Sequence, residues 1–184
     1  MNIDGLFDEL ADLGVCASGR RLWKKSSRDV DMIIKVWKQW PEYFVEHSAP
    51  ALKIVRRYFS SEQDLKELED NCIFLDRNID VDLDSEESVF VVGNTSGNIR
   101  IKDWATVKLY CFNNSNLNIE CGIHSYVNIE CYDSSALSIL SNKGKCIIYS
   151  YDKSVVDTLN SSAHVIQKDI QRGKVFNGRE VEND

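Results

Sequence analysis

A single spacing rule covers the second half of this 184-residue chain. From residue 79 onward, pairs of apolar residues separated by one residue recur every 8 to 10 residues, and small residues lie two positions before or after most pairs. Residues at i and i+2 share one face of a β-strand. A repeat this regular is typical of a solenoid, in which each short strand stacks on a later copy. The copies, of which the tenth is degenerate, are Ile79/Val81, Val89/Val91, Ile99/Ile101, Val107/Leu109, Leu117/Ile119, Val127/Ile129, Leu137/Ile139, Cys146/Ile148, Val156/Thr158 and Val165/Gln167.

The outward residues of these strands indicate how the rungs stack. If each coil holds two rungs, Asp80 and Asp82 lie beside Arg100 and Lys102 on one outer face, as cross-strand pairing favours. The opposite outer face is then clearly more apolar. A triangular coil with three rungs is the alternative, but in it the charge pairing on one face and the apolar character of the other would both be less clear. We therefore predict a flattened, two-sided parallel β-solenoid over residues 76–170, right-handed like other parallel crossovers.

Residues 1–75 show helical periodicity instead, which predicts a small helical bundle before the solenoid and an α+β fold class. The expected helices are one that ends at Gly14, one over 16–25, one from Ser27 to Pro41, one that begins at Ser48 and Pro50, and one from Ser61 with Asp64 as a capping-box partner.

Three of the four tryptophans, Trp23, Trp37 and Trp40, fall in this helical module. We expect them to form its core, and a binding cleft lined by them is the alternative. At the other end of the chain, Asn177-Gly178 is a hairpin signal, so residues 171–184 are expected to cap the last open coil.

Composition narrows the class of protein. The net charge of −7 argues against a general nucleic-acid binder, and no apolar run approaches the length of a membrane span. The first residues lack a basic stretch followed by an apolar one, so we expect no secretory signal and a cytoplasmic location.

The repeat residues also carry a family resemblance. The segment Val127-Asn128-Ile129-Glu130-Cys131-Tyr132-Asp133-Ser134-Ser135 resembles the short A-T-V-x-A-Y-x-S repeats of uncharacterised phage and prophage proteins of bacteria. Some of those proteins have an N-terminal helical segment with a Cys-x-x-Gly-x-x-Trp pattern, and the stretch from Cys16 to Trp23 is similar but one residue longer. The resemblance implies a bacterial or phage-related origin and no assigned activity.

Cysteine and acidic patterns are the first candidates for chemistry. Cys111, Cys121 and Cys131 are ten residues apart, which is a metal-ligand possibility only if the thiols converge. In a two-sided coil Cys121 lies on the opposite sheet from the other two, so we predict that all three are small core residues. The alternating acids from Asp80 to Glu86 lack the glycine and the final glutamate of a calcium loop, and are expected on the outer face of the first rung.

Histidines and paired carboxylates give no catalytic pattern. His47, His124 and His164 are scattered along the chain and no Ser/His/Asp order is present. Glu120 and Glu130 would face opposite ways in the two-sided coil, so they cannot act as a glycosidase pair. We therefore predict no catalytic, cofactor-binding or metal-binding residues, and no cofactor.

The function expected from these patterns is a non-enzymatic structural or protein-interaction module. Its partner would be another protein or a second copy of the chain, with no role for nucleic acid or membrane. A carbohydrate-binding or carbohydrate-cleaving β-helix protein is the alternative. Ile147 and Tyr149 are the favoured contacts, because the helices are expected to fold back over the first coils. The candidate interaction surface on the more apolar face is Phe90, Val92, Tyr110, Ile147 and Tyr149.

Overall fold

The computed structural model describes residues 3–14, 19–21, 29–39, 41–158, 161–168, 175–176 and 179–180. The chain divides into two compact units, of which one is Met1–Asn71 with Phe176–Asp184 and the other is Cys72–Val175.

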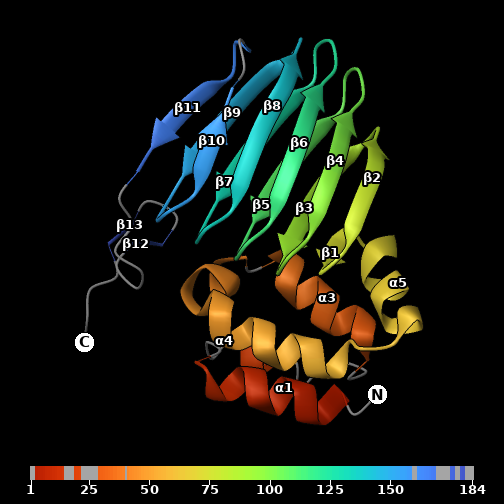
Figure 1. Ribbon diagram of the computed structural model, residues 1–184. Coiled ribbons are helices and arrows are strands. Elements are labelled where there is room, and N and C mark those ends of the chain that lie inside the picture. Colours follow the sequence, from red (N-terminus) through yellow and green to blue (C-terminus); the bar gives the residue numbers. More distant parts are fainter. Residues whose placement is uncertain are drawn as a thin grey trace. The chain divides into compact units, whose positions relative to one another are not determined.

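The unit Cys72–Val175 is a parallel β-solenoid built from two sheets (Figure 1). Successive strands alternate between the sheets, so each strand pairs with the next strand but one along the chain. This confirms the predicted two-sided coil. Sheet A contains β1 (Ile73–Leu75), β3 (Glu86–Val92), β5 (Thr106–Cys111), β7 (Tyr126–Cys131), β9 (Lys145–Ser150) and β11 (His164–Gln167). Sheet B contains β2 (Asn78–Leu83), β4 (Ser96–Ile101), β6 (Asn116–Cys121), β8 (Ala136–Asn142) and β10 (Val155–Asp157).

The stacking register varies between pairs of strands. Val107 pairs with Val127 in sheet A and Ile119 pairs with Ile139 in sheet B, so these partners are twenty residues apart. Partners are eighteen residues apart between β2 and β4 and nineteen between β7 and β9. The pairing of β6 with β8 also shifts after Ile119, so that Glu120 pairs with Ser141. The structure also adds a strand, β1, before the first copy of the repeat.

The inward side chains of both sheets form one dry core. Leu109, Ile119, Ile129 and Ile148 are fully buried there, as the two-residue spacing predicts. Gly97 shows how close the coils approach, since a Cβ at this position would lie 1.9 Å from the carbonyl oxygen of Ile79 and its φ is +132°. Only glycine fits that conformation and that space.

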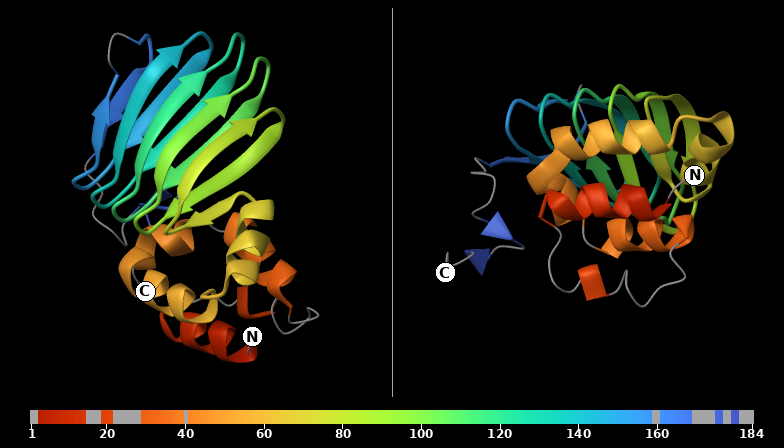
Figure 2. Two further views of the ribbon diagram at one scale, coloured as in Figure 1. Left: turned by 45° about the vertical axis from the view of Figure 1, so that its right-hand side comes forward. Right: turned by 90° about the horizontal axis from the view of Figure 1, so that it is seen from below.

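The solenoid has two corners, and successive turns stack in line at each of them (Figure 2). We call the turns that leave sheet A the A-to-B corner and those that leave sheet B the B-to-A corner. At the A-to-B corner Asn113, Asp133 and Asp152 all have positive φ values, of 62°, 61° and 56°. Asx side chains tolerate this conformation and bond to backbone N–H groups. The N–H of Asn113 donates to Asp133 Oδ2 at 2.9 Å, and the N–H of Asp133 donates to Asp152 Oδ2 at 3.1 Å, so the turns are tied from coil to coil.

The helical unit contains α1 (Ile3–Asp12), α3 (Val30–Gln39), α4 (Glu42–Tyr58) and α5 (Glu62–Asp70). Trp37 is 3% exposed and its ring lies 5.1 Å from Phe44 and 5.8 Å from Phe59, measured between ring centroids. The prediction that Trp37 is a core residue is therefore confirmed. Trp23 and Trp40 lie outside the described residues, as do Ser27 and most of the helix expected over 16–25.

Helix boundaries agree with the sequence at α5 and, for its second segment, at α4. The Ser61 side chain accepts from the Asp64 N–H and the Asp64 side chain accepts from the Ser61 N–H, so the capping box is confirmed. The element α4 spans Glu42–Tyr58 and consists of two helical segments joined at a kink, because His47 has a non-helical conformation (φ −122°, ψ 24°). The second segment begins after His47, as expected from Ser48 and Pro50, and Pro50 lies in its first turn, where a missing N–H costs no helical hydrogen bond. The first segment, from Glu42, was not expected from the sequence.

Two short strands, β12 (Val175–Phe176) and β13 (Arg179–Glu180), pair with each other, and Asn177-Gly178 between them lies outside the described residues. That this segment caps the last coil stays a prediction.

Candidate functional site

On the outer face of sheet B, charged side chains of β2 and β4 form ion pairs with one another. The Arg100 guanidinium contacts both Asp80 and Asp82, and Lys102 Nζ lies 2.9 Å from Asp82 Oδ2. Hydrogen bonds from Lys102 and Arg100 hold the pKa of Asp82 below its usual value. Further along, the Asn118 side-chain amide donates to Asn98 Oδ1 at 3.0 Å. The predicted pairing of charges on this face is confirmed, and these groups are already engaged with one another.

The outer face of sheet A is different, because aromatic and apolar residues lie in register along it. Phe90 pairs with Tyr110, Tyr110 with Glu130, and Glu130 with Tyr149. The rings of Phe90 and Tyr110 are stacked, with centroids 4.9 Å apart.

The five residues of the candidate interaction surface fall into two groups. Phe90, Val92 and Tyr110 are buried, with exposed fractions of 1%, 4% and 3%. Ile147 and Tyr149 are half-buried, and Lys168 Nζ lies 4.6 Å from the centre of the Tyr149 ring. Only the second group is accessible, and its role in binding stays a prediction.

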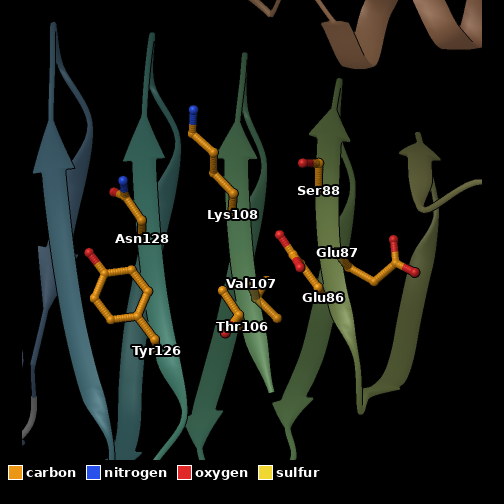
Figure 3. A pocket seen from close by; sticks show the side chains of 8 residues that line it. All are labelled: Glu86, Glu87, Ser88, Thr106, Val107, Lys108, Tyr126 and Asn128. Atoms are coloured by element: carbon orange, nitrogen blue, oxygen red, sulfur yellow. The ribbon is translucent and has the colours of Figure 1, made fainter. Parts of the chain in front are cut away.

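A shallow hollow of about 460 Å³ lies on the same face, over the first halves of β3, β5 and β7 (Figure 3). Three strands contribute to it, and its border includes Tyr126, which is 41% exposed. Its volume is within the range of small-ligand pockets. The lining residues are Glu86, Glu87, Ser88, Thr106, Val107, Lys108, Tyr126 and Asn128.

The polar groups of the hollow are sparse and mixed in charge. The side chains of Glu86 and Glu87 point in opposite directions, with Glu86 directed toward β5 (Figure 3). Lys108 supplies one ammonium group, whose Nζ lies 5.0 Å from the centre of the Tyr110 ring. The Oδ1 atom of Asn128 is buried and accepts no hydrogen bond from any described residue. Among the described residues, Asn128 thus offers the hollow an acceptor without a donor, and the negative charge of Glu86 is matched by the positive charge of Lys108.

The B-to-A corner beside this hollow carries an exposed aromatic pair. Trp104 is 74% exposed and has a φ of 67°, and its ring lies 4.4 Å from that of His124, measured between centroids. Ile123, in the same turn as His124, is 46% exposed. Sequence reasoning missed Trp104, although one signal was present: a bulky aromatic residue at a turn position where the next coil has His124.

The A-to-B corner contains buried aromatic residues. Phe112, Tyr132 and Tyr151 form a stack with centroid separations of 5.2 Å and 4.8 Å. Burial and the neighbouring Glu130 carboxylate, which accepts a hydrogen bond from the Tyr132 hydroxyl, raise the pKa of Tyr132. Burial also raises the pKa of Tyr151, to about 12. This stack belongs to the framework.

The repeat cysteines lie in the core, as predicted. Cys111 pairs with Cys131 in sheet A, whereas Cys121 lies in sheet B, and all three are buried. A hydrogen bond with Cys131, together with burial, raises the pKa of the Cys111 thiol. A raised pKa favours the neutral thiol, which is a poor nucleophile and a poor metal ligand. Among the residues that the structure describes, no group of three or more His, Cys, Asp or Glu side chains could hold a metal ion.

The other predicted positions are also located. His47 is at the kink of α4, His124 is in a turn, and His164 begins β11. Glu120 is in sheet B and Glu130 is in sheet A, so the two carboxylates belong to opposite sheets. This confirms that they do not form a pair.

Comparison of the chain with family models, with curated proteins and with solved structures found no match. None of the described helices is long and apolar enough to cross a membrane.

Proposed function

We propose that this protein is a non-enzymatic structural or protein-interaction module that binds a protein partner or a second copy of itself in the cytoplasm. The observation that carries the proposal is the contrast between the two outer faces. The strands β2 and β4 of sheet B pair their own charges, whereas β9 of sheet A presents the half-buried side chains of Ile147 and Tyr149 on a rigid surface. Partly exposed aliphatic and aromatic side chains on a rigid surface are suited to anchoring a partner. The resemblance to phage and prophage repeats suggests where such a module would act.

The arrangement of carboxylates supports a role without catalysis. Hydrolysis of a glycosidic bond needs two carboxyl groups that flank it at a fixed separation. Glu120 and Glu130 lie in different sheets, and Glu86 and Glu87 point away from each other (Figure 3). Carbohydrate binding without cleavage is the second candidate function, and it concerns the hollow over β3, β5 and β7, whose residue Asn128 pairs with Ile147.

The test of the interaction proposal is the double variant Ile147→Ser/Tyr149→Ser. We expect weaker self-association in light scattering, or a lower yield of bound protein in a pull-down, with the melting temperature changed by only a few degrees. The matched control is Leu140→Ser, which alters a residue that is 45% exposed on sheet B. Association that is unchanged in the double variant, together with a sharp fall in its melting temperature, would show that these side chains serve packing alone.

A further inference from the structure

Trp104 occupies a conformation that a bulky residue rarely adopts. Its φ of 67° lies in the left-handed region, where residues other than Gly, Asn and Asp are disfavoured. Its ring is 74% exposed, so burial does not offset this cost. A strained and exposed aromatic side chain is a reason to look for a function at that position.

The Trp104 turn leads directly into the hollow on sheet A. Thr106 and Tyr126 are the first residues of β5 and β7, they pair in register, and both line the hollow. Trp104 and His124 lie two residues before them in the chain. The two turns that carry the exposed ring pair therefore adjoin the end of the hollow from which these strands start.

The hollow selects against peptides and against anions. β5 and β7 are interior strands of sheet A, so their backbone groups are paired on both sides and cannot bind a peptide by adding a strand. The Glu86 carboxylate disfavours a phosphate or another anion, and Lys108 disfavours a cation. A ligand without net charge that is recognised by side chains avoids both repulsions.

The remaining groups suit a ligand rich in hydroxyl groups. The half-buried Asn128 side chain lines the hollow and its Oδ1 lacks a donor among the described residues, so rotation of the amide toward the hollow would allow a ligand hydroxyl to supply one. Ser88 and Thr106 can donate or accept, and the rings of Trp104 and Tyr126 offer apolar surfaces. Sugars combine hydroxyl edges with apolar C–H faces, which are the two features that these side chains complement.

We propose that the hollow and the Trp104–His124 pair form a binding site for a neutral carbohydrate chain. The Trp104 ring stacks on the C–H face of one sugar, and Asn128 Oδ1 accepts a hydrogen bond from a hydroxyl group of a neighbouring sugar. This inference does not depend on the protein-interaction proposal, because the two sites use different side chains.

The experiment uses the full chain on an array of neutral oligosaccharides built from hexose and N-acetylhexosamine units, with sulfated and uronic-acid oligosaccharides as charged members. We expect binding to neutral members only. The first variant is Trp104→Asn, which removes the ring while Asn tolerates the turn, as Asn113 does with a φ of 62°. The second is Asn128→Ala. Each should weaken the array-selected interaction by about tenfold or more, as loss of a central contact does.

Two further measurements separate binding from folding. Neither variant should lower the melting temperature, because one relieves backbone strain and the other removes an unsatisfied acceptor. The control Leu140→Asn removes an exposed apolar residue from sheet B and should bind as the wild type does. The selected oligosaccharide should also protect wild-type tryptophan fluorescence from acrylamide quenching, and this protection should be lost in Trp104→Asn.

Three results would overturn the proposal. These are an array with no neutral member above background, a preference for the charged members, and neutral binding that Trp104→Asn and Asn128→Ala leave unchanged. Loss of a protein partner, with no change on the array, would assign Trp104 to a protein interface instead. Ile147 pairs with Asn128 across β7 and β9, so the variant that separates the two proposals is Tyr149→Ser alone, which should bind oligosaccharide normally and weaken the protein interaction.

Discussion

At both corners of the solenoid the chain turns through a residue with a positive φ value. Aromatic residues are buried at one corner and exposed at the other. At the A-to-B corner, Phe112 and Tyr132 are buried, with exposed fractions of 0% and 3%, and their rings are stacked. At the B-to-A corner, Trp104 is 74% exposed although its ring also contacts a ring of the next coil. Stacking from coil to coil is therefore compatible with both burial and exposure, and the position of the ring within the turn decides between them.

The difference follows from which residue takes the positive φ. In Phe112-Asn113-Asn114-Ser115 the aromatic residue comes first, and Asn113 adopts the left-handed conformation. In Asp103-Trp104-Ala105 the tryptophan itself has the positive φ. The left-handed conformation is thus adopted by Asn113, which tolerates it, at one corner and by the bulky Trp104 at the other. We infer that the first arrangement serves stability and that the second serves binding.

The largest expected effect comes from the core that both corners share. Ile129 on β7 is fully buried between Leu109 and Ile148, so Ile129→Asp would place an unpaired charge in the dry stack. The expected loss is roughly 4 kcal/mol or more in the free energy of unfolding. Asn128→Asp, one position along the same strand, should cost far less because that side chain lies on the outer face. Equal melting temperatures for the two variants would contradict the register.

Removal of one ring from each corner tests the comparison directly. Tyr132→Ala deletes a ring that lies 5.2 Å from Phe112 and 4.8 Å from Tyr151, and should cost about 3–5 kcal/mol, as large-to-small changes of buried aromatic residues do. Trp104→Asn should change the free energy of unfolding by no more than about 0.5 kcal/mol. Chemical denaturation of both variants gives these values. A large loss at Trp104 would make the two corners equivalent and would remove the case for a binding role.

Smaller effects are expected from the aspartates of the two corners. Asp133 accepts from the Asn113 N–H at 2.9 Å and has a φ of 61°, whereas Asp103 accepts from the Ile123 N–H at 2.7 Å and has no positive φ. Asp133→Ala loses a hydrogen bond and also strains alanine, at a total of about 2 kcal/mol. Asp103→Ala loses only the hydrogen bond, at about 1 kcal/mol.

Glycine separates the two contributions at Asp133. Asp133→Gly relieves the strain and should bring the loss close to that of Asp103→Ala. If Asp133→Ala and Asp133→Gly are equally stable in urea titrations, the positive φ adds nothing to the cost at this corner.

The parts of the fold that repeat were predictable from the sequence. An inward residue recurs at every second position and its partner lies one coil later, so the spacing by itself pairs Leu109 with Ile129. The alternation of Asp82 with Arg100 identified the two-sided coil for the same reason. Local chemistry also sufficed for the capping box at Ser61 and Asp64.

The parts that break the repeat were not predictable. The shift in the pairing of β6 with β8 occurs at a single position after Ile119, and the pairing of β1 depends on a strand of only three residues. The hollow arises where outward side chains of three strands leave space between them, which no spacing rule describes. The exposure of Trp104 depends on its backbone conformation, and its sequence neighbours do not reveal that.

A further expected effect at the A-to-B corner is a dependence of stability on alkaline pH. Burial raises the pKa of Tyr151 from 10.0 to about 12 and also raises that of Tyr132. The folded state therefore holds these protons more tightly than the unfolded state, so the stabilisation is complete below pH 10 and is lost as the pH rises toward 12. The melting temperature of the wild type should fall more between these pH values than that of Tyr132→Phe/Tyr151→Phe, which cannot ionise at either position. Parallel pH profiles for the two proteins would mean that these hydroxyl groups titrate alike in both states, and the stack would then resemble the exposed corner in its contact with water.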